Sequence, residues 1–155
     1  MKVATVLWPG LTSASSVQSF DWRTLAIVQR VAPEIPTVYL TAQQPFMDNI
    51  QSGCPSSPWT AGLHVSQFLN SVPRMIEAAG GAVWSPYYGE VTPENVREAH
   101  TLGLKVVVWT VNEAPDMRRM IELGVDGIIS DYPDQLREIA SEVSMPLPLP
   151  TPVTC

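Results

Sequence analysis

The stretch from Leu104 to Leu136 constrains the fold more than any other part of the chain. Lys105–Val111 is an apolar, β-branched run, long enough to predict a strand that is covered on both faces. Pro115 suits the first turn of a helix, where its missing N–H costs nothing, and Gly124 suits the end of that helix. Asp126–Ile129 begins a second strand. We therefore expect a β-α-β unit whose strands are parallel, with a right-handed crossover.

Three glycines repeat this pattern at intervals of about 21 or 22 residues. Gly81, Gly103 and Gly124 each end a helical pattern and each precede an apolar run. This rhythm is typical of tightly connected β-α units. The sequence therefore predicts five strands, at Val17–Phe20, Thr37–Thr41, Ala82–Ser85, Lys105–Val111 and Asp126–Ile129.

Helices are expected between these strands. Asp21 suits the N-cap of a helix whose apolar face carries Leu25, Val28 and Ala32. Gln43–Phe68 is rich in Pro, Gly and Ser and predicts a long loop, and loops of this length are usually functional or disordered. The other predicted helices are Leu69–Ala79, Pro93–Leu102, Pro115–Leu123 and Pro133–Glu142. Pro73 disfavours the first half of the first of these.

Parallel strands joined by helices fit either an open doubly wound sheet or an arc of a (β/α)8 barrel. A GxGxxG phosphate-binding turn would favour the first architecture, and the sequence contains none. A complete barrel typically needs about 250 residues, whereas this chain has 155. The chain is too short for a closed barrel, so the residues alone leave both architectures open.

The charge balance argues against some partners. The formal net charge is -6 and the pI about 4.7, which disfavours a nucleic acid held through its phosphates. The sequence has no run of basic residues that would bind a membrane surface. No apolar run approaches the roughly 20 residues of a transmembrane helix. Cys54 and Cys155 are able to pair, but we expect two free thiols.

The two ends of the chain are predicted to lie outside the folded unit, which spans residues 17–142. Residues 1–16 are expected to be an irregular lead-in or a start inside a longer gene. An export signal is an alternative, but Pro9 interrupts the apolar run that such a signal needs. Without an export signal, a cytoplasmic location is expected. Residues 143–155 include the run MPLPLPTPVTC, which predicts a disordered tail or, alternatively, a PxxP-type ligand.

Three segments occur in an order and at a spacing that resemble one enzyme family. They are VQSFDWRTL at Val17–Leu25, VVVWTVN at Val106–Asn112 and GVDGIISDYPDQL at Gly124–Leu136. Over about Val17–Ile139 the chain resembles the C-terminal half of the glycerophosphodiester phosphodiesterases. The resemblance implies a (β/α)8 TIM barrel, so we expect an α/β fold that forms about the last five β-α units of that barrel and has open edges.

The resemblance also implies a reaction, the hydrolysis of small-molecule glycerophosphodiesters to an alcohol and glycerol 3-phosphate. In that family a His-Arg pair, an E-x-D carboxylate pair, a further His and a Glu-x-Lys carry the chemistry, and the carboxylates hold a divalent metal, Mg or Ca. The sequence contains neither His-Arg nor E-x-D. We therefore expect no catalytic residue and no metal ligand in this chain.

The remaining histidines and several carboxylates are expected to be structural. His64 lies in the long loop, and His100 lies on a helix that should be outside the barrel. For both histidines a solvated or hydrogen-bonded role is expected. The carboxylates predicted at helix caps or on outer faces are Glu94, Glu98, Asp116 and Glu122.

Residues at the C-terminal ends of the strands are the candidates for substrate binding, because the reactive face of such barrels lies there. Ser19 and Phe20 end the first strand, and Trp109 lies near the end of the fourth. The resemblance makes Trp109 an apolar wall that packs against substrate carbons, with barrel-core packing as the alternative. Asn112 is expected either to offer its amide to the substrate or to cap a helix. Asp131 reaches the pocket rim or, as we expect, structures the turn that follows.

Other aromatic side chains are hypothesised to border the same pocket. Trp84, Tyr87 and Tyr88 belong to the third strand and the residues after it, so we expect them at the pocket mouth. Phe46 and Trp59 lie in the long loop, which would fold over the same face.

Five β-α units cannot close a barrel, so both outer strands would present open edges, and inward side chains such as Val107 and Ile128 would lose their cover. The preferred interpretation is an inactive piece of a complete phosphodiesterase. A half barrel that pairs with itself or with a separate N-terminal chain is the second. The third is a non-catalytic binding or regulatory half-barrel that needs a partner.

Overall fold

The computed structural model describes residues 15–145 and 147. Most of the expected lead-in, most of the expected tail and Cys155 lie outside the described residues. The described part contains a five-stranded sheet in the order β1-β2-β5-β6-β7, and every neighbouring pair in it is parallel. Its strands are β1 (Val17–Ser19), β2 (Thr37–Thr41), β5 (Val83–Pro86), β6 (Lys105–Val108) and β7 (Gly127–Ile128).

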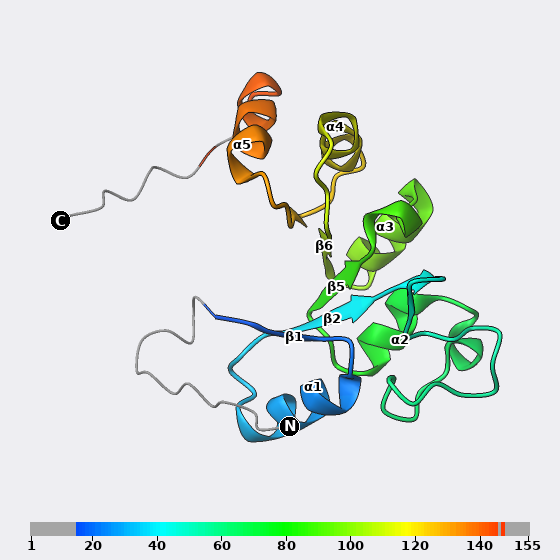
Figure 1. Cartoon of the computed structure of the whole chain (residues 1–155). Coiled ribbons are helices and arrows are strands. Elements are labelled where there is room, and N and C mark those ends of the chain that lie inside the picture. Colours follow the sequence, from blue (N-terminus) through cyan, green and yellow to red (C-terminus); the bar gives the residue numbers. More distant parts are fainter. Residues whose placement is uncertain (1–14, 146, 148–155) are drawn as a thin grey trace.

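The strands curve into an open arc with the helices along its outer side (Figure 1). Among the described residues, β1 and β7 are each paired on one side only, so this part of the chain leaves both edges of the arc open. Within the described ranges, no helix has the length and apolar character needed to cross a membrane. The helices are α1 (Trp22–Val31), α2 (Val72–Ala78), α3 (Pro93–Thr101), α4 (Ala114–Glu122) and α5 (Pro133–Glu142).

The hydrophobic core lies between the sheet and the helices. Trp84 and Val106 point from the strands into this core, and Val108 is fully buried in it. Because side chains alternate along a strand, Val107 points to the opposite face. Ile128 is the partner of Val108 in the sheet and packs against the same core. The expectation that Ile128 points inward is therefore wrong by one residue of register.

Most helix boundaries follow local sequence signals. The Asp21 carboxylate accepts the Arg23 N–H at 3.1 Å and caps α1, as predicted. The predicted start of the second helix at Leu69 is wrong, because Leu69 is left-handed, with φ 58°. The helix begins after the N-cap Ser71, and Pro73 lies in its first turn, where the missing N–H removes no helical hydrogen bond.

Glycine ends three of the helices. At two of them it is the predicted glycine, and at the third it is the residue before. Gly103 and Gly124 have positive φ, as expected for helix ends. After α2 the residue with positive φ is Gly80, at 73°, and not Gly81. Gly81 is needed for a different reason, since a Cβ there would lie 2.5 Å from Ile76 Cγ2 and 2.9 Å from the Tyr39 ring.

The substitution Gly81→Ala tests this close contact. We expect it to lower the free energy of unfolding by about 1 to 3 kcal/mol, because the added methyl group overfills the core. Gly53→Ala is the matched control, since a Cβ there meets nothing within 4 Å, and it should change stability by less than about 0.5 kcal/mol. Urea denaturation of both variants measures the difference, and equal stabilities would contradict the close contact.

The long predicted loop contains regular structure. It forms the antiparallel hairpin β3 (Gln43–Gln44) and β4 (Met47–Asp48) and the 3-10 helix η2 (Val65–Phe68). Asn49, fully buried, donates from its amide nitrogen to Phe20 O at 3.1 Å and Leu40 O at 3.0 Å. Its amide oxygen accepts the Ala42 N–H at 2.9 Å. Asn49 therefore joins the ends of β1 and β2 to the hairpin.

The substitution Asn49→Ala should destabilise the chain by at least about 2 kcal/mol, because it leaves buried backbone groups without partners. Gln135→Ala removes an exposed amide from α5 and should cost less than about 0.5 kcal/mol. Thermal or urea unfolding of the two variants checks the contrast. A stable Asn49→Ala variant would mean that these backbone groups find water or other partners.

Candidate functional site

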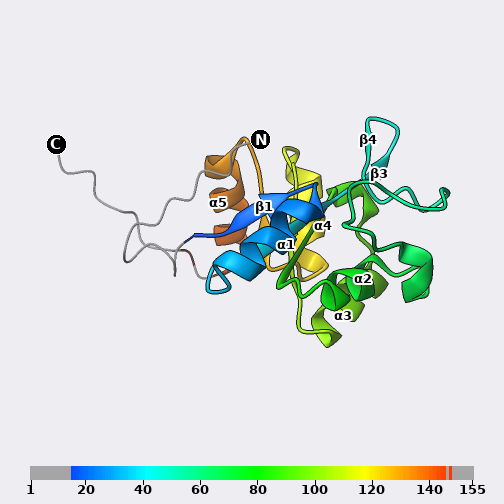
Figure 2. The same ribbon diagram turned by 90° about the horizontal axis from the view of Figure 1, so that it is seen from below.

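The carboxyl ends of the parallel strands meet at one edge of the arc. Phe20 directly follows β1, and Trp109 directly follows β6. Tyr87 lies between β5 and the 3-10 helix η3 (Tyr88–Glu90). The hairpin β3–β4 follows β2 and stands out from the body of the chain (Figure 2). Four β-α units therefore contribute residues to the edge where the substrate site was predicted.

Four aromatic rings form a continuous chain of contacts at this edge. Phe20 and Trp109 meet edge to face, with ring centres 5.4 Å apart and planes at 86°. Trp109 contacts Tyr87 at 5.8 Å, and Tyr87 contacts Phe46 at 5.3 Å. Such ring pairs contribute about 0.5–1.5 kcal/mol each beyond the area that they bury. We refer to Phe20, Phe46, Tyr87 and Trp109 as the aromatic cluster.

Trp109 is fixed by hydrogen bonds on both its backbone and its side chain. Its indole Nε1–H donates to Ser85 O at 2.9 Å, and its backbone N–H donates to Pro86 O at 3.2 Å. Its carbonyl accepts the Tyr88 N–H at 3.0 Å. Strand alternation puts Trp109 on the face away from the helices, where its ring stays half-buried. This position suits the predicted apolar wall.

The two polar candidates, Ser19 and Asn112, are engaged within the chain. Ser19 Oγ accepts the Asp21 N–H at 3.0 Å. The Asn112 amide oxygen accepts the Asp131 N–H at 3.0 Å, and its nitrogen donates to Asp131 Oδ2 at 2.9 Å. Glu113, and not Asn112, occupies the N-cap of α4. Asn112 thus joins the segment after β6 to the segment after β7 through Asp131, and within the turn before Pro133 the Tyr132 N–H donates to Ser130 Oγ at 3.0 Å.

Of the other aromatic candidates, Trp84 and Trp59 lie outside the aromatic cluster, and the Tyr88 ring contacts only the Tyr87 ring of the cluster. Trp84 is 3% exposed and donates from Nε1 to Thr41 Oγ1 at 2.9 Å, within the helix-side core. The hypothesis that Trp84 shapes the pocket mouth is therefore wrong. The Tyr88 ring lies 4.9 Å from the Tyr87 ring, tilted by 58°, and its hydrogen bond with Tyr87, more than burial, raises the pKa of Tyr88. Trp59 is exposed and makes no ring contact with the cluster.

Both histidines are bound within the chain. His64 caps η2, with Nδ1 2.8 Å from Ser66 Oγ. His100 Nε2 lies 2.9 Å from an Asp126 carboxylate oxygen, at the amino ends of β6 and β7. Burial alone would raise the pKa of Asp126, but hydrogen bonds from Lys105, Val106 N–H and His100 hold it below its usual value. This cluster lies at the opposite end of the strands from the rings.

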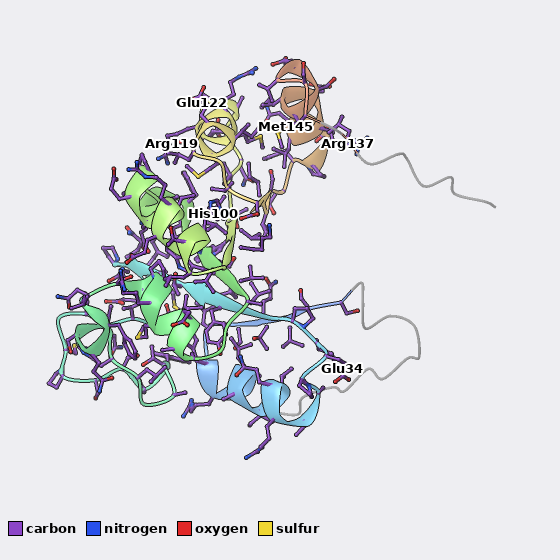
Figure 3. All side chains as sticks on the ribbon, turned by 180° about the vertical axis from the view of Figure 1, so that it is seen from behind. Glu34, His100, Arg119, Glu122, Arg137 and Met145 are labelled. Carbon is purple, nitrogen blue, oxygen red and sulfur yellow. The ribbon has the colours of Figure 1, made fainter. Side chains whose placement is uncertain are left out.

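The carboxylates expected on the outer helices lie there. Glu98 binds Arg74 at 2.7 Å and accepts the Ser71 hydroxyl. Glu94 and Asp116 form ion pairs with arginines three residues further along their own helices. Figure 3 shows Glu122 beside Arg119 on α4.

The donor side chains of the described residues are dispersed. Among residues 15–145 and 147, no three His, Cys, Asp or Glu side chains gather in a group that could hold a metal ion. The described residues therefore do not fit the Mg or Ca that the resemblance implies, and no reaction step through a metal follows from them.

A separate cavity opens on the helical side of the sheet. Its volume is about 400 Å³, and Trp84, Arg74 and Glu98 are among its lining residues. No member of the aromatic cluster lines it. It lies outside the predicted barrel interior, so the aromatic cluster, and not this cavity, is the candidate substrate site.

Comparisons with known proteins agree with the fold and the segment order. A glycerophosphodiester phosphodiesterase of Bacillus subtilis (strain 168) is 27% identical over 123 residues, which cover 79% of this chain and 35% of that protein. One from Caldanaerobacter subterraneus subsp. tengcongensis is 47% identical over 51 residues, covering 33% of this chain and 21% of the other. This chain therefore spans well under half the length of these relatives.

The crystal structure of a putative glycerophosphoryl diester phosphodiesterase from Silicibacter pomeroyi DSS-3 superposes with a TM-score of 0.67 and 41% identity. The match covers 84% of this chain and 38% of that one, which confirms the expected partial (β/α)8 barrel. The model of the glycerophosphoryl diester phosphodiesterase family matches residues 3–135, starting earlier than the resemblance noted from Val17. The chain belongs to the glycerophosphoryl diester phosphodiesterase family.

Proposed function

We propose that this chain forms the C-terminal arc of a glycerophosphodiester phosphodiesterase and supplies the apolar wall of its substrate site. The observation that carries the proposal is the edge-to-face contact of Phe20 and Trp109 at 5.4 Å. The two residues lie at the carboxyl ends of β1 and β6, on the edge where (β/α)8 barrels bind their substrates.

The aromatic cluster offers carbon surface and few hydrogen-bond donors. The indole N–H of Trp109 is already donated to Ser85 O, so its ring presents an apolar face. Such a face is suited to the carbons of glycerol or of the esterified alcohol and would exclude water from them. It is not suited to the phosphate, whose charge needs donors or a metal ion.

The groups that cleave the phosphodiester bond are proposed to come from outside this sequence. His-Arg and E-x-D are absent from it, and a metal held by those carboxylates would bind the phosphate beside the apolar wall. The sheet formed by residues 15–145 has five strands, whereas the closed barrel has eight. A partner arc of three β-α units would cover the edges of β1 and β7 and carry the catalytic groups. These open edges also support the second candidate, a non-catalytic half-barrel that binds such a partner.

Calorimetric titration of the purified chain tests the apolar wall. We expect binding of glycerol 3-phosphate and glycerophosphocholine, and an affinity about fivefold to tenfold lower for Trp109→Ala, because the ring surface is lost. Trp109→Phe should retain most of the affinity. Trp59→Ala is the matched control, since Trp59 is exposed and lies outside the cluster.

The same titrations contain the outcomes that contradict the proposal. Equal affinities for the chain and Trp109→Ala would remove the apolar wall from the substrate site. A second measurement addresses the catalytic groups: the purified chain should release no choline from glycerophosphocholine with Mg or Ca present. Steady release that scales with the chain's concentration would show that the catalytic groups lie within it.

A further inference from the structure

The aromatic cluster extends beyond the two residues that the family segments contain. Tyr87 bridges Trp109 to Phe46, which lies at the turn of the hairpin β3–β4. Phe46 is 64% exposed although it packs against Tyr87. Because most of the Phe46 side chain is exposed, its ring is accessible to a ligand.

The hairpin that carries Phe46 is fixed from two sides. One oxygen of Glu90 accepts the Gln43 N–H at 2.7 Å and the Gln44 side-chain amide at 2.8 Å. On the other side, the buried Asn49 side chain accepts the Ala42 N–H at 2.9 Å. These contacts determine where the Phe46 ring lies relative to Tyr87.

Phe46 and Tyr87 form a corner. Their ring planes meet at 78°, with centres 5.3 Å apart, so the two rings can flank one small group. The hairpin contributes Asp48 and no lysine or arginine. Arg119, which donates to Tyr88 O at 3.4 Å, is already paired with Asp116.

The chemistry of such a corner favours one class of alcohol. Aromatic faces attract methylated ammonium groups, which carry positive charge and bind water weakly. An alcohol with many hydroxyls would lose hydrogen bonds to water and find no replacement on the Phe46 ring.

We propose that Phe46 and Tyr87 select the alcohol part of the substrate, favouring a methylated ammonium alcohol such as choline over a polyhydroxylated one such as inositol. Glu90 is the positioning residue that holds the hairpin for this contact. The inference rests on the proposed function, because it assigns the alcohol to the Phe46 side of the cluster and the glycerol carbons to the Phe20 and Trp109 side.

Calorimetric titration of the full chain with three ligands tests the selection. The ligands are glycerophosphocholine, glycerophosphoinositol and glycerol 3-phosphate, which lacks the alcohol. We expect the chain to prefer the choline ester, and Phe46→Ala to reduce that preference about threefold to tenfold while leaving the affinity for glycerol 3-phosphate unchanged. Phe46→Tyr should keep the preference. Glu90→Ala should reduce it in the same direction, also without changing glycerol 3-phosphate binding.

Leu69→Ala is the control, since Leu69 is 81% exposed and is the C-cap of η2, outside the aromatic cluster. It should leave all three affinities unchanged. Equal affinities for the two diesters, or a preference that survives Phe46→Ala, would overturn the selection while binding of glycerol 3-phosphate sustains the proposed function. Loss of glycerol 3-phosphate binding in Phe46→Ala would also overturn it, because the ring would then act on the whole ligand. Absence of binding for all three ligands would overturn both proposals.

Discussion

The parallel pairing of every strand in the main sheet is the constraint on which the rest of the structure depends. Parallel neighbours need a crossover, so a helix covers one face, and all carboxyl ends meet at one edge. That edge brings together Phe20, Tyr87 and Trp109 from separate β-α units. Alternation along β6 then sends Val106 and Val108 into the helix-side core and leaves Trp109 for the other face.

The sequence predicted the parts of the fold that depend on local signals. The strand Thr37–Thr41 and the helix Pro133–Glu142 match the structure at both ends. The start of α2 was missed because Leu69 is apolar and fits a helical pattern, although its backbone is left-handed. The adjacent glycines Gly80 and Gly81 look alike in sequence. Only the folded chain shows that Gly80 has positive φ, whereas a Cβ at Gly81 would meet Ile76 and the Tyr39 ring.

The candidate site was predictable where it depended on strand ends, and not where it depended on contacts distant in sequence. Phe20 and Trp109 follow strands, so the β-α rhythm was enough to bring them together. Trp84 was misassigned because a shift of one residue in a short strand reverses the face of every side chain. The hydrogen-bond partners of Asn112 and Asn49 could not be predicted from the sequence. Each amide binds backbone or side-chain groups that only the folded chain brings near.

The open edges and the missing catalytic motifs have one common explanation under our proposal. The described residues supply five of the eight strands that would close a barrel, and the sequence lacks the His-Arg and E-x-D residues. Strands inserted between β7 and β1 would lie across the barrel axis from the middle of this arc and would point their carboxyl ends at the same mouth. Charged groups and a metal ion on that side would face Phe20 and Trp109 on this one.

A glycerophosphodiester is itself divided into an anionic phosphate and carbon-rich ends, so a site with one charged and one aromatic wall matches both parts of the molecule. Such a site also places the rings where they exclude water from the bond to be cleaved, which strengthens the electrostatic contacts on the opposite wall.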